Sequence, residues 1–132
     1  MVAAAHDLSI EQGALFYKQF RWALPALDDP SLPGEGIDLS EATARLQMRK
    51  KYGEEIYLEA TTENGLLALG ADGSIVMDFR GEDTDALSVR SLAYDLEVVI
   101  PVGHTVMRAG IYRVLEGRVA VTLNITREGS DV

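Results

Sequence analysis

The chain has 132 residues, of which 47% are hydrophobic and 25% charged, with no cysteine and a formal net charge of −9. This length suits one domain spanning 1–132, for which we expect flexible tails at 1–6 and 127–132. The absence of cysteine excludes disulfides and thiol catalysis, and the acidic balance argues against nucleic acids and membranes as partners.

Apolar and polar residues alternate with a period of two along most of the chain, which is typical of strands with one buried face. Residues 7–22 predict one strand or two, with Gly13 at a bend or bulge. Phe20 and Trp22 share a face of this segment, and we expect both in the core. Residues 23–36 predict a loop, because proline and glycine recur there and proline cannot donate to a sheet ladder.

The middle of the chain predicts strands joined by tight turns. We expect a strand at 42–50 and another at 55–61. Asn64-Gly65 follows and predicts a hairpin, since this dipeptide favours the positive backbone angles of a two-residue turn. Asp72-Gly73 predicts a second tight turn, which leads into a strand at 74–80.

The last third predicts one short helical turn near 83–88 and then long extended segments. A strand is expected at 92–100, and the stretch 105–126 is expected to kink at Glu116-Gly117 because it exceeds the usual strand length. The total is seven to nine short strands with turns about every ten residues. This pattern predicts an all-β fold, an antiparallel β-sandwich of the immunoglobulin-like kind.

The residues that carry chemistry do not form a recognisable constellation. Two histidines, His6 and His104, are too few for a zinc site without cysteine. Glu54-Glu55 and Glu82-Asp83 are adjacent acids in polar turns, unlike the facing, partly desolvated pair of a glycosidase. We therefore predict a protein that is not an enzyme, with no catalytic, metal or cofactor-binding residues and no cofactor.

Several surface positions are candidates for an interface. On the expected strand at 42–50, Arg45 and Arg49 share the outward face, where pairing with acidic neighbours such as Glu55 or Glu59 is the ordinary interpretation. Docking of an acidic partner is the alternative. Tyr17 lies opposite the core-facing aromatics, and tyrosine is enriched at interfaces. With residues of the expected loop and turns added, the candidates are Tyr17, Pro30, Pro33, Arg45, Arg49, Asn64 and Asp72.

Five segments, in order along the chain, carry a resemblance to known proteins. They are Ile10–Ala14 with the following Phe16, Ile37–Ser40, Ala44–Arg49, Tyr94–Glu97 and Leu115–Val119. Together they resemble a family of small β-sandwich structural proteins of tailed bacteriophages and prophages. Lys18, where an apolar residue is expected, and the proline-rich loop depart from the family. The resemblance implies a virion component of the tail, baseplate or fibre-adaptor region, and it brings no catalytic residues.

We therefore expect a structural protein of a tailed-phage virion, assembled in the host cytoplasm. Its sheet faces and loops would contact other virion proteins and copies of itself, as a homo-oligomer or symmetric array. One alternative is a decoration or cement protein of the phage head. Another is a carbohydrate-binding module, which would present Tyr17, Tyr52, Tyr57 and Tyr112 to a sugar.

Overall fold

The computed structural model describes residues 4–25, 27–29, 31–51 and 55–125. Strands make up nearly all of its regular structure, which confirms the expected all-β class. In chain order the elements are β1 (Ala4–Ala5), β2 (Leu8–Glu11), β3 (Phe16–Arg21), β4 (Ala23–Pro25), β5 (Pro33–Gly36), β6 (Thr43–Arg49), β7 (Ile56–Thr61), β8 (Leu67–Leu69), β9 (Ser74–Phe79), α1 (Gly81–Thr84), β10 (Ser91–Ile100) and β11 (Gly110–Thr122).

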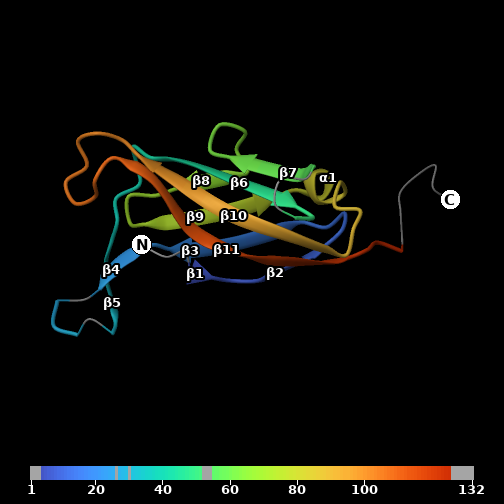
Figure 1. Ribbon diagram of the computed structural model, residues 1–132, viewed down its shortest axis with the longest axis horizontal. Coiled ribbons are helices and arrows are strands. Elements are labelled where there is room, and N and C mark those ends of the chain that lie inside the picture. The colour runs from blue at the N-terminus through green and yellow to red at the C-terminus, as the bar shows by residue number, and fades with distance from the viewer. Residues whose placement is uncertain (1–3, 26, 30, 52–54, 126–132) are drawn as a thin grey trace.

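The strands form two main sheets that pack against each other as a sandwich (Figure 1). The larger sheet has the order β1-β11-β10-β6-β7, with β2 also paired to β11, and the smaller has the order β3-β9-β8. These orders match the G-F-C-C′ and B-E-D sheets of an immunoglobulin-like sandwich. Pairing is antiparallel except along one edge, where β1 and β2 run parallel to β11.

The core lies between the two sheets and is filled by every second residue of their central strands. Leu46 and Met48 enter it from β6, Leu96 from β10, and Met77 and Phe79 from β9, all with no exposed surface. Burying each such side chain contributes about 1.5–3 kcal/mol relative to leaving it in water. The period-two pattern of the sequence therefore predicts correctly which face of these strands is buried.

A bulge in β11 changes which residues face the core. Arg113 and Leu115 pair with adjacent residues of β10, which leaves Val114 as the extra residue. Odd-numbered residues therefore point outward before the bulge and inward after it. Ile111, which shares the odd parity of the buried Leu115, is therefore exposed. The irregularity lies at Val114, where the register shifts, and not at the expected Glu116-Gly117.

One of the two predicted hairpin turns joins paired strands and the other does not. Asp72-Gly73 lies between β8 and β9, which pair, so this hairpin is confirmed. Asn64-Gly65 instead carries the chain from β7 in the larger sheet to β8 in the smaller. The Asn64 side chain accepts the backbone N–H groups of Thr61 and Leu66, each at 3.0 Å. The dipeptide thus builds a tight turn as predicted, but between sheets, and the predicted hairpin is wrong.

Three further differences concern short elements. The expected loop at 23–36 contains a β4–β5 hairpin, which forms a two-stranded sheet of its own. The helical turn expected near 83–88 is α1, which begins at Gly81 because the Asp83 carboxylate accepts the Arg80 backbone N–H at 2.9 Å. With β1, β4 and β5 included, the described part of the chain holds eleven strands, against the seven to nine expected.

The N-terminal segment is part of the sandwich from residue 4 onward. A flexible tail was expected at 1–6, yet β1 pairs with β11 and the His6 backbone N–H donates to the Glu116 carbonyl oxygen at 2.8 Å. The ring of His6 also lies edge-on to Phe20, with centroids 4.9 Å apart, and Phe20 is half-buried where full burial was expected. The tail expected at 127–132 lies outside the described residues.

Tyr94→Phe tests the bond that fixes this segment. The Tyr94 hydroxyl donates to the His6 carbonyl oxygen. Burial, with a smaller contribution from the Asp7 charge, raises the pKa of Tyr94 to about 12, so the hydroxyl keeps its proton at neutral pH. Its loss leaves the carbonyl without this donor, and we expect the free energy of unfolding to fall by about 1–2 kcal/mol.

Urea unfolding measures the effect, with Tyr17→Phe as the matched control at an exposed tyrosine. The control should change the free energy of unfolding by less than about 0.5 kcal/mol. Equal stability of the two variants would contradict a structural role for the Tyr94 hydroxyl.

Candidate functional site

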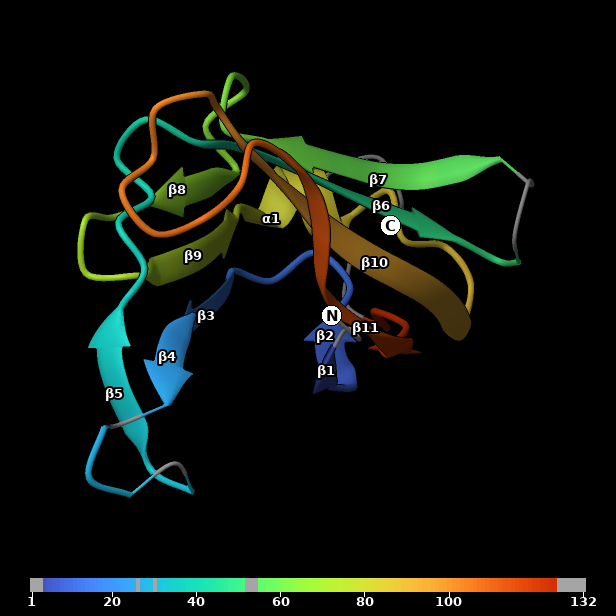
Figure 2. The same cartoon turned by 60° about the vertical axis from the view of Figure 1, so that its left-hand side comes forward.

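Three connections meet at one end of the sandwich, which we call the hairpin end (Figures 1 and 2). They are the β4–β5 hairpin at 23–36, the β8–β9 turn at 70–73 and the β10–β11 loop at 101–109. They occupy the positions of the B–C, D–E and F–G connections of an immunoglobulin-like sandwich. Binding residues are found disproportionately on such connections, because a rigid scaffold positions them.

Backbone contacts with the β8–β9 turn fix the root of the hairpin. The Trp22 N–H donates to the Gly73 carbonyl at 2.8 Å, and the Ile37 N–H donates to the Trp22 carbonyl at 2.9 Å. The backbones approach so closely that a Cβ on Gly36 would lie 1.7 Å from the Asp72 carbonyl oxygen. A Cβ on Gly73 would lie 2.3 Å from the carbonyl oxygen of Trp22. Both positions therefore require glycine, and the hairpin leaves the sandwich from a rigid base.

Arg21 and Asp72 strengthen the same root with polar contacts. The Arg21 guanidinium donates to the carbonyl oxygens of Asp72 at 3.2 Å and of Gly34 at 3.0 Å, so it links the turn to the hairpin. The Asp72 carboxylate accepts the Ser74 backbone N–H at 3.0 Å. Hydrogen bonds from the side chain and backbone of Ser74 lower the pKa of Asp72, and the Arg21 charge adds to this effect.

The tip of the hairpin exposes apolar and acidic side chains together. Leu27 is fully exposed and Leu32 is 54% exposed. Asp28, Asp29 and Glu35 are exposed beside them. Large apolar side chains that project on a fixed element and are rimmed by charge have the composition of a protein-binding surface.

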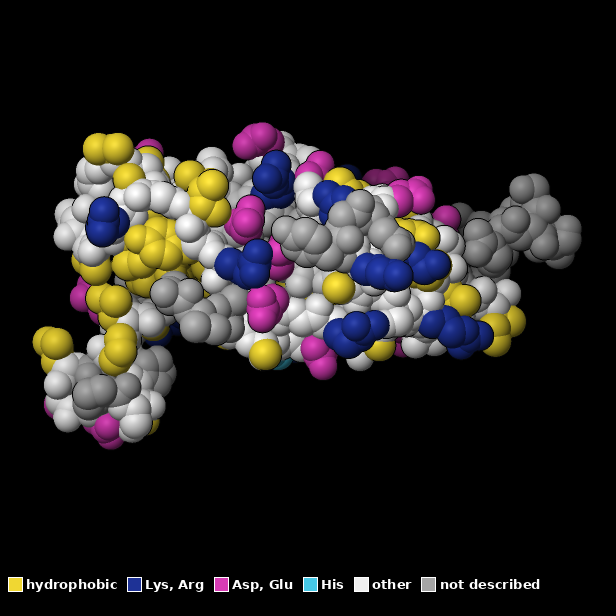
Figure 3. All heavy atoms as spheres, viewed as in Figure 1, with side chains coloured by type: hydrophobic (Ala, Val, Ile, Leu, Met, Phe, Trp, Pro, Cys, Tyr) yellow, Lys and Arg dark blue, Asp and Glu magenta, His cyan; other side chains and the backbone are white. Residues whose placement is uncertain are grey.

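The β10–β11 loop adds a second group of exposed apolar residues, and a histidine orders it. His104 accepts the backbone N–H groups of Val106 at 3.0 Å and Met107 at 2.9 Å through Nδ1. Nε2 lies 2.7 Å from the Asp38 carbonyl oxygen and donates to it, since Nδ1 is already the acceptor of a neutral ring. Val102 is 90% exposed and Val106 is also exposed, so apolar side chains gather at this end (Figure 3).

A second surface feature is a hollow of about 500 Å³ on the outer face of the larger sheet, which we call the outer groove. Outward side chains of β6, β10 and β11 line it. Arg45 lies 4.0 Å from Glu97, and Arg113 lies 3.5 Å from Asp95 and 3.6 Å from Glu116. These ion pairs are exposed, so each contributes no more than about 1 kcal/mol to stability.

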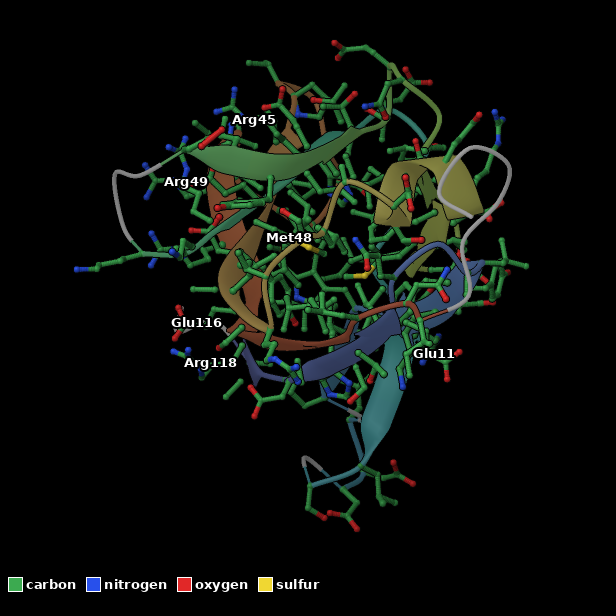
Figure 4. The ribbon with its side chains drawn as sticks, turned by 90° about the vertical axis from the view of Figure 1, so that its right-hand side faces the viewer. Glu11, Arg45, Met48, Arg49, Glu116 and Arg118 are labelled. Atoms are coloured by element: carbon green, nitrogen blue, oxygen red, sulfur yellow. The ribbon has the colours of Figure 1, made fainter. Side chains whose placement is uncertain are left out.

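The outward orientation predicted for Arg45 and Arg49 is confirmed, and both side chains make polar contacts on that face. Arg45 pairs with Glu97 of β10. Arg49 donates to the Gln47 side chain at 2.7 Å, and Gln47 donates to Glu59 at 2.6 Å. Gln47 thus bridges Arg49 to Glu59, which is one of the two carboxylates that the sequence offered as partners. Figure 4 shows Arg45 and Arg49 on the outside of the sheet, whereas Met48 points between the sheets.

The seven interface candidates from the sequence do not form one site. Two belong to the hairpin end and two to the outer groove, and two others are isolated from both. Asp72 and Pro33 are at the hairpin end, Arg45 and Arg49 line the outer groove, Tyr17 is exposed on β3, Asn64 is in the β7–β8 turn, and Pro30 lies outside the described residues.

The sequence did not predict that the β10–β11 loop contributes exposed apolar residues to the hairpin end. Val102 and Val106 gave a signal, since they are apolar residues in a segment that a proline and a glycine mark as a turn. His104 gave none, because its bond to Asp38 joins segments that are 66 positions apart in the chain.

The tyrosines offered for sugar binding are not arranged as a platform in the described part of the chain. Tyr17 is exposed, but Tyr57 and Tyr112 are half-buried, and Tyr52 lies outside the described residues. The Tyr112 ring packs on Trp22, with centroids 5.6 Å apart. A sugar-binding surface needs exposed rings that share a plane, and the half-buried rings of Tyr57 and Tyr112 do not meet this need.

The described part of the chain holds neither a metal-binding cluster of side chains nor a helix that could span a membrane. No group of three or more His, Asp or Glu side chains among residues 4–25, 27–29, 31–51 and 55–125 is placed to hold a metal ion. In the same residues, no helix combines the length and apolar character that crossing a membrane requires.

His104→Ala should loosen the β10–β11 loop without unfolding the sandwich. The variant removes the acceptor for Val106 and Met107 and the donor to Asp38. We expect the two amides to exchange with solvent at least about tenfold faster, since their protection comes from local bonds. Hydrogen exchange measures this, with Thr105→Ala in the same loop as the control. Unchanged exchange at both amides would contradict the role of the ring.

Acid should loosen the hairpin end for a different reason. Hydrogen bonds from Ser74 and Ser40 lower the pKa of Asp72 and Asp38, respectively. A carboxyl whose folded pKa lies below the unfolded value of about 3.9 contributes stability above that value and loses it as pH falls through the folded pKa. We therefore expect the protection of the Ser74 amide to hold from neutral pH down to about pH 4 and to be lost progressively as the pH falls further, through the folded pKa of Asp72.

The matched control for the acid effect is Asp72→Asn, which cannot titrate. It should abolish the pH step at Ser74 and keep the step at Ser40. A step at Ser74 that survives in this variant would show that another group is responsible.

The chain was also compared with known proteins. No protein-family model matches it, and no relative is found among curated proteins. The resemblance to phage structural proteins therefore remains a hypothesis that rests on the five sequence segments.

Proposed function

We propose that this protein is a non-enzymatic structural component of a tailed-phage virion that docks on its neighbours through the hairpin end. The observation that carries the proposal is the β4–β5 hairpin, which projects from a root closed by Gly36 and Gly73 and exposes Leu27 and Leu32. Those neighbours would be copies of the same chain and other proteins of the tail, baseplate or fibre-adaptor region.

A rigid root favours docking because the hairpin backbone is already ordered before a partner binds. Association costs free energy for every side chain and loop that becomes ordered, and a preorganised element avoids part of that cost. Burial of Leu27 and Leu32 against a partner would supply about 1.5–3 kcal/mol for each side chain. Val102 and Val106 on the neighbouring loop would extend the same apolar contact.

The phage setting is supported by the five ordered segments that resemble phage structural proteins. Virion parts are repeated around symmetry axes, and simultaneous contacts among repeated copies turn weak pairwise binding into stable assembly. The small contact surface of the hairpin end suits a repeated virion protein, because the affinity of each single contact need not be high.

The proposal is tested in particles produced by a host that carries the gene. We expect mass spectrometry of separated heads and tails to find the protein in the tail fraction. When the deletion is complemented, Leu27→Asp should reduce incorporation, because the charge opposes burial of this position. Leu15→Asp is the matched control, since Leu15 is 70% exposed in the β2–β3 connection, away from the hairpin; it should incorporate normally.

Other outcomes decide against the proposal. Absence of the protein from both fractions would overturn the virion assignment, and presence in heads alone would establish the decoration alternative instead. Equal incorporation of the two leucine variants would remove the hairpin from the contact.

A further inference from the structure

We propose that the outer edge of β3 binds an extended segment of another protein, which joins the smaller sheet as a fourth, antiparallel strand. The segment would carry an acidic residue opposite Lys18 and an apolar residue two positions away on either side. This surface is separate from the hairpin end, so the inference goes beyond the proposed function and does not depend on it.

The edge of β3 is open because the N-terminal strands pair elsewhere. In an immunoglobulin-like fold with an A-B-E-D sheet, the first strand lies beside strand B. Here β1 and β2 pair with β11 of the larger sheet, so β3 is the last strand of the order β3-β9-β8. Figure 2 shows β8, β9 and β3 following one another on one side of the sandwich. In the described part of the chain, the smaller sheet therefore lacks the strand that would cover β3.

Alternate backbone groups of β3 point away from its sheet. The Trp22 N–H donates to the Gly73 carbonyl oxygen at 2.8 Å, and the register continues the same kind of pair at every second residue of β3. The residues between such pairs direct their backbone groups to the other side of the strand. The N–H and C=O groups of Tyr17, Gln19 and Arg21 therefore face outward, where a fourth strand would bond to them.

The edge of β7 shows how this chain closes an edge of the same length. Both β3 and β7 have six residues. On β7 the Asn64 side chain replaces a further strand, because Nδ2 donates to the Glu59 carbonyl oxygen and Oδ1 accepts the Thr61 N–H, each at 3.0 Å. Among the described residues, no side chain bonds in this way to the outer edge of β3. A row of unpaired N–H and C=O groups is a template for pairing with another chain.

The inner face of β3 carries one charge between two aromatic rings. Cross-strand partners share a face, and Lys18 is the partner of Met77, which is fully buried. Phe16 and Phe20 lie two positions away on either side, and both are half-buried. Lys18 is exposed and makes no ion pair with a residue that the structure describes. An inward charge on an edge strand opposes pairing with a second copy of the same chain.

The charge of Lys18 determines what an added strand must carry. For an antiparallel strand on this edge, the inward residues of β3 fall in the non-hydrogen-bonded pairs, where opposite side chains are closest. A carboxylate opposite Lys18 would form an ion pair, and apolar residues two positions away would cover Phe16 and Phe20. A neutral or basic residue opposite Lys18 would leave a partly buried cation without a partner. The edge therefore selects for an acidic residue between two apolar ones.

A hollow beside Phe20 offers room for one of the apolar side chains. Its volume is about 260 Å³, and it lies between β1 and the end of β3. Ala5, Phe20, Trp22 and Leu115 are among its lining residues, so its walls are largely apolar. An inward side chain opposite Phe20 would point toward this hollow, and its burial would add to the affinity of the backbone bonds.

Short synthetic peptides test the proposal on the full chain. The probe has a central glutamate, valine two positions away on both sides and threonine elsewhere; matched peptides carry glutamine or lysine at the centre. By NMR titration at about 150 mM salt, we expect the glutamate peptide to bind with a dissociation constant of about 1 mM or tighter. It should bind at least about threefold more tightly than either matched peptide. The amides of Tyr17, Gln19 and Arg21 should gain protection from exchange.

The overall charge of the protein makes this preference informative. With a net charge of −9, the chain attracts the lysine peptide and repels the glutamate peptide at long range. A preference for glutamate must therefore come from a local cation.

Lys18→Glu is the decisive variant. It should reverse the preference, so that the lysine peptide binds at least about threefold more tightly than the glutamate peptide. A misfolded variant cannot imitate this result, because the variant gains affinity for one peptide while it loses affinity for the other. Arg90→Glu is the matched control, since it changes the net charge equally at an exposed residue before β10 of the larger sheet. This control should keep the preference for glutamate.

Gln19→Pro tests whether the backbone of β3 makes the contact. Proline removes the N–H that faces the added strand, and edge strands tolerate proline where that group faces solvent. The glutamate peptide should bind at least about threefold more weakly, while circular dichroism shows an intact sandwich. Gln19→Ala keeps the N–H and should bind the peptide like the natural chain.

Four results would overturn the inference. The first is a glutamate peptide that does not bind at about 10 mM. The second is equal binding of the glutamate and lysine peptides by the natural chain. The third is undiminished binding by folded Gln19→Pro, which would assign the peptide to the hollow alone. The fourth is a natural chain that dimerises with concentration-dependent protection of the Gln19 amide, which would make a second copy the occupant of the edge.

Discussion

Strict alternation of inward and outward side chains on β6 and β10 is the constraint on which the rest of the structure depends. Leu46 and Leu96 are cross-strand partners that point into the core, and Arg45 and Glu97 are partners on the outer face. A slip of one residue would move the charged set inward and the apolar set outward. The free energy of burying the core therefore also fixes the register of the charges. Core packing therefore also fixes the positions of the side chains that line the outer groove. The exposed ion pairs in the groove do not have to be strong to hold this arrangement.

The hairpin end shows how a projecting element can be added without disturbing that core. The hairpin occupies the B–C connection, and its root is held by backbone contacts at Gly36 and Gly73 and by the Arg21 guanidinium. Trp22, directly before the β4–β5 hairpin, is buried as the sequence predicted, so the chain leaves the core at a fixed point. The contacts that hold the root are made by backbone atoms and by Arg21. The side chains at the tip therefore do not take part in holding the hairpin in place.

The sequence predicted what depends on local pattern and failed where distant segments decide. The alternation of apolar and polar residues predicted most of the strands, their buried face and the outward orientation of the two arginines of β6. The bulge at Val114 was not predictable, because it appears only when β11 is placed against β10. Asn64-Gly65 predicted a turn correctly but not which sheet the next strand joins. Pro25 and Pro33 indicated a loop, yet they are register partners in the two-stranded β4–β5 sheet. The N–H group that proline lacks costs little in so small a sheet. At the candidate site, composition indicated a loop at 23–36 and a turn at Asp72, whereas the contact of His104 with Asp38 joins distant segments and left no local signal.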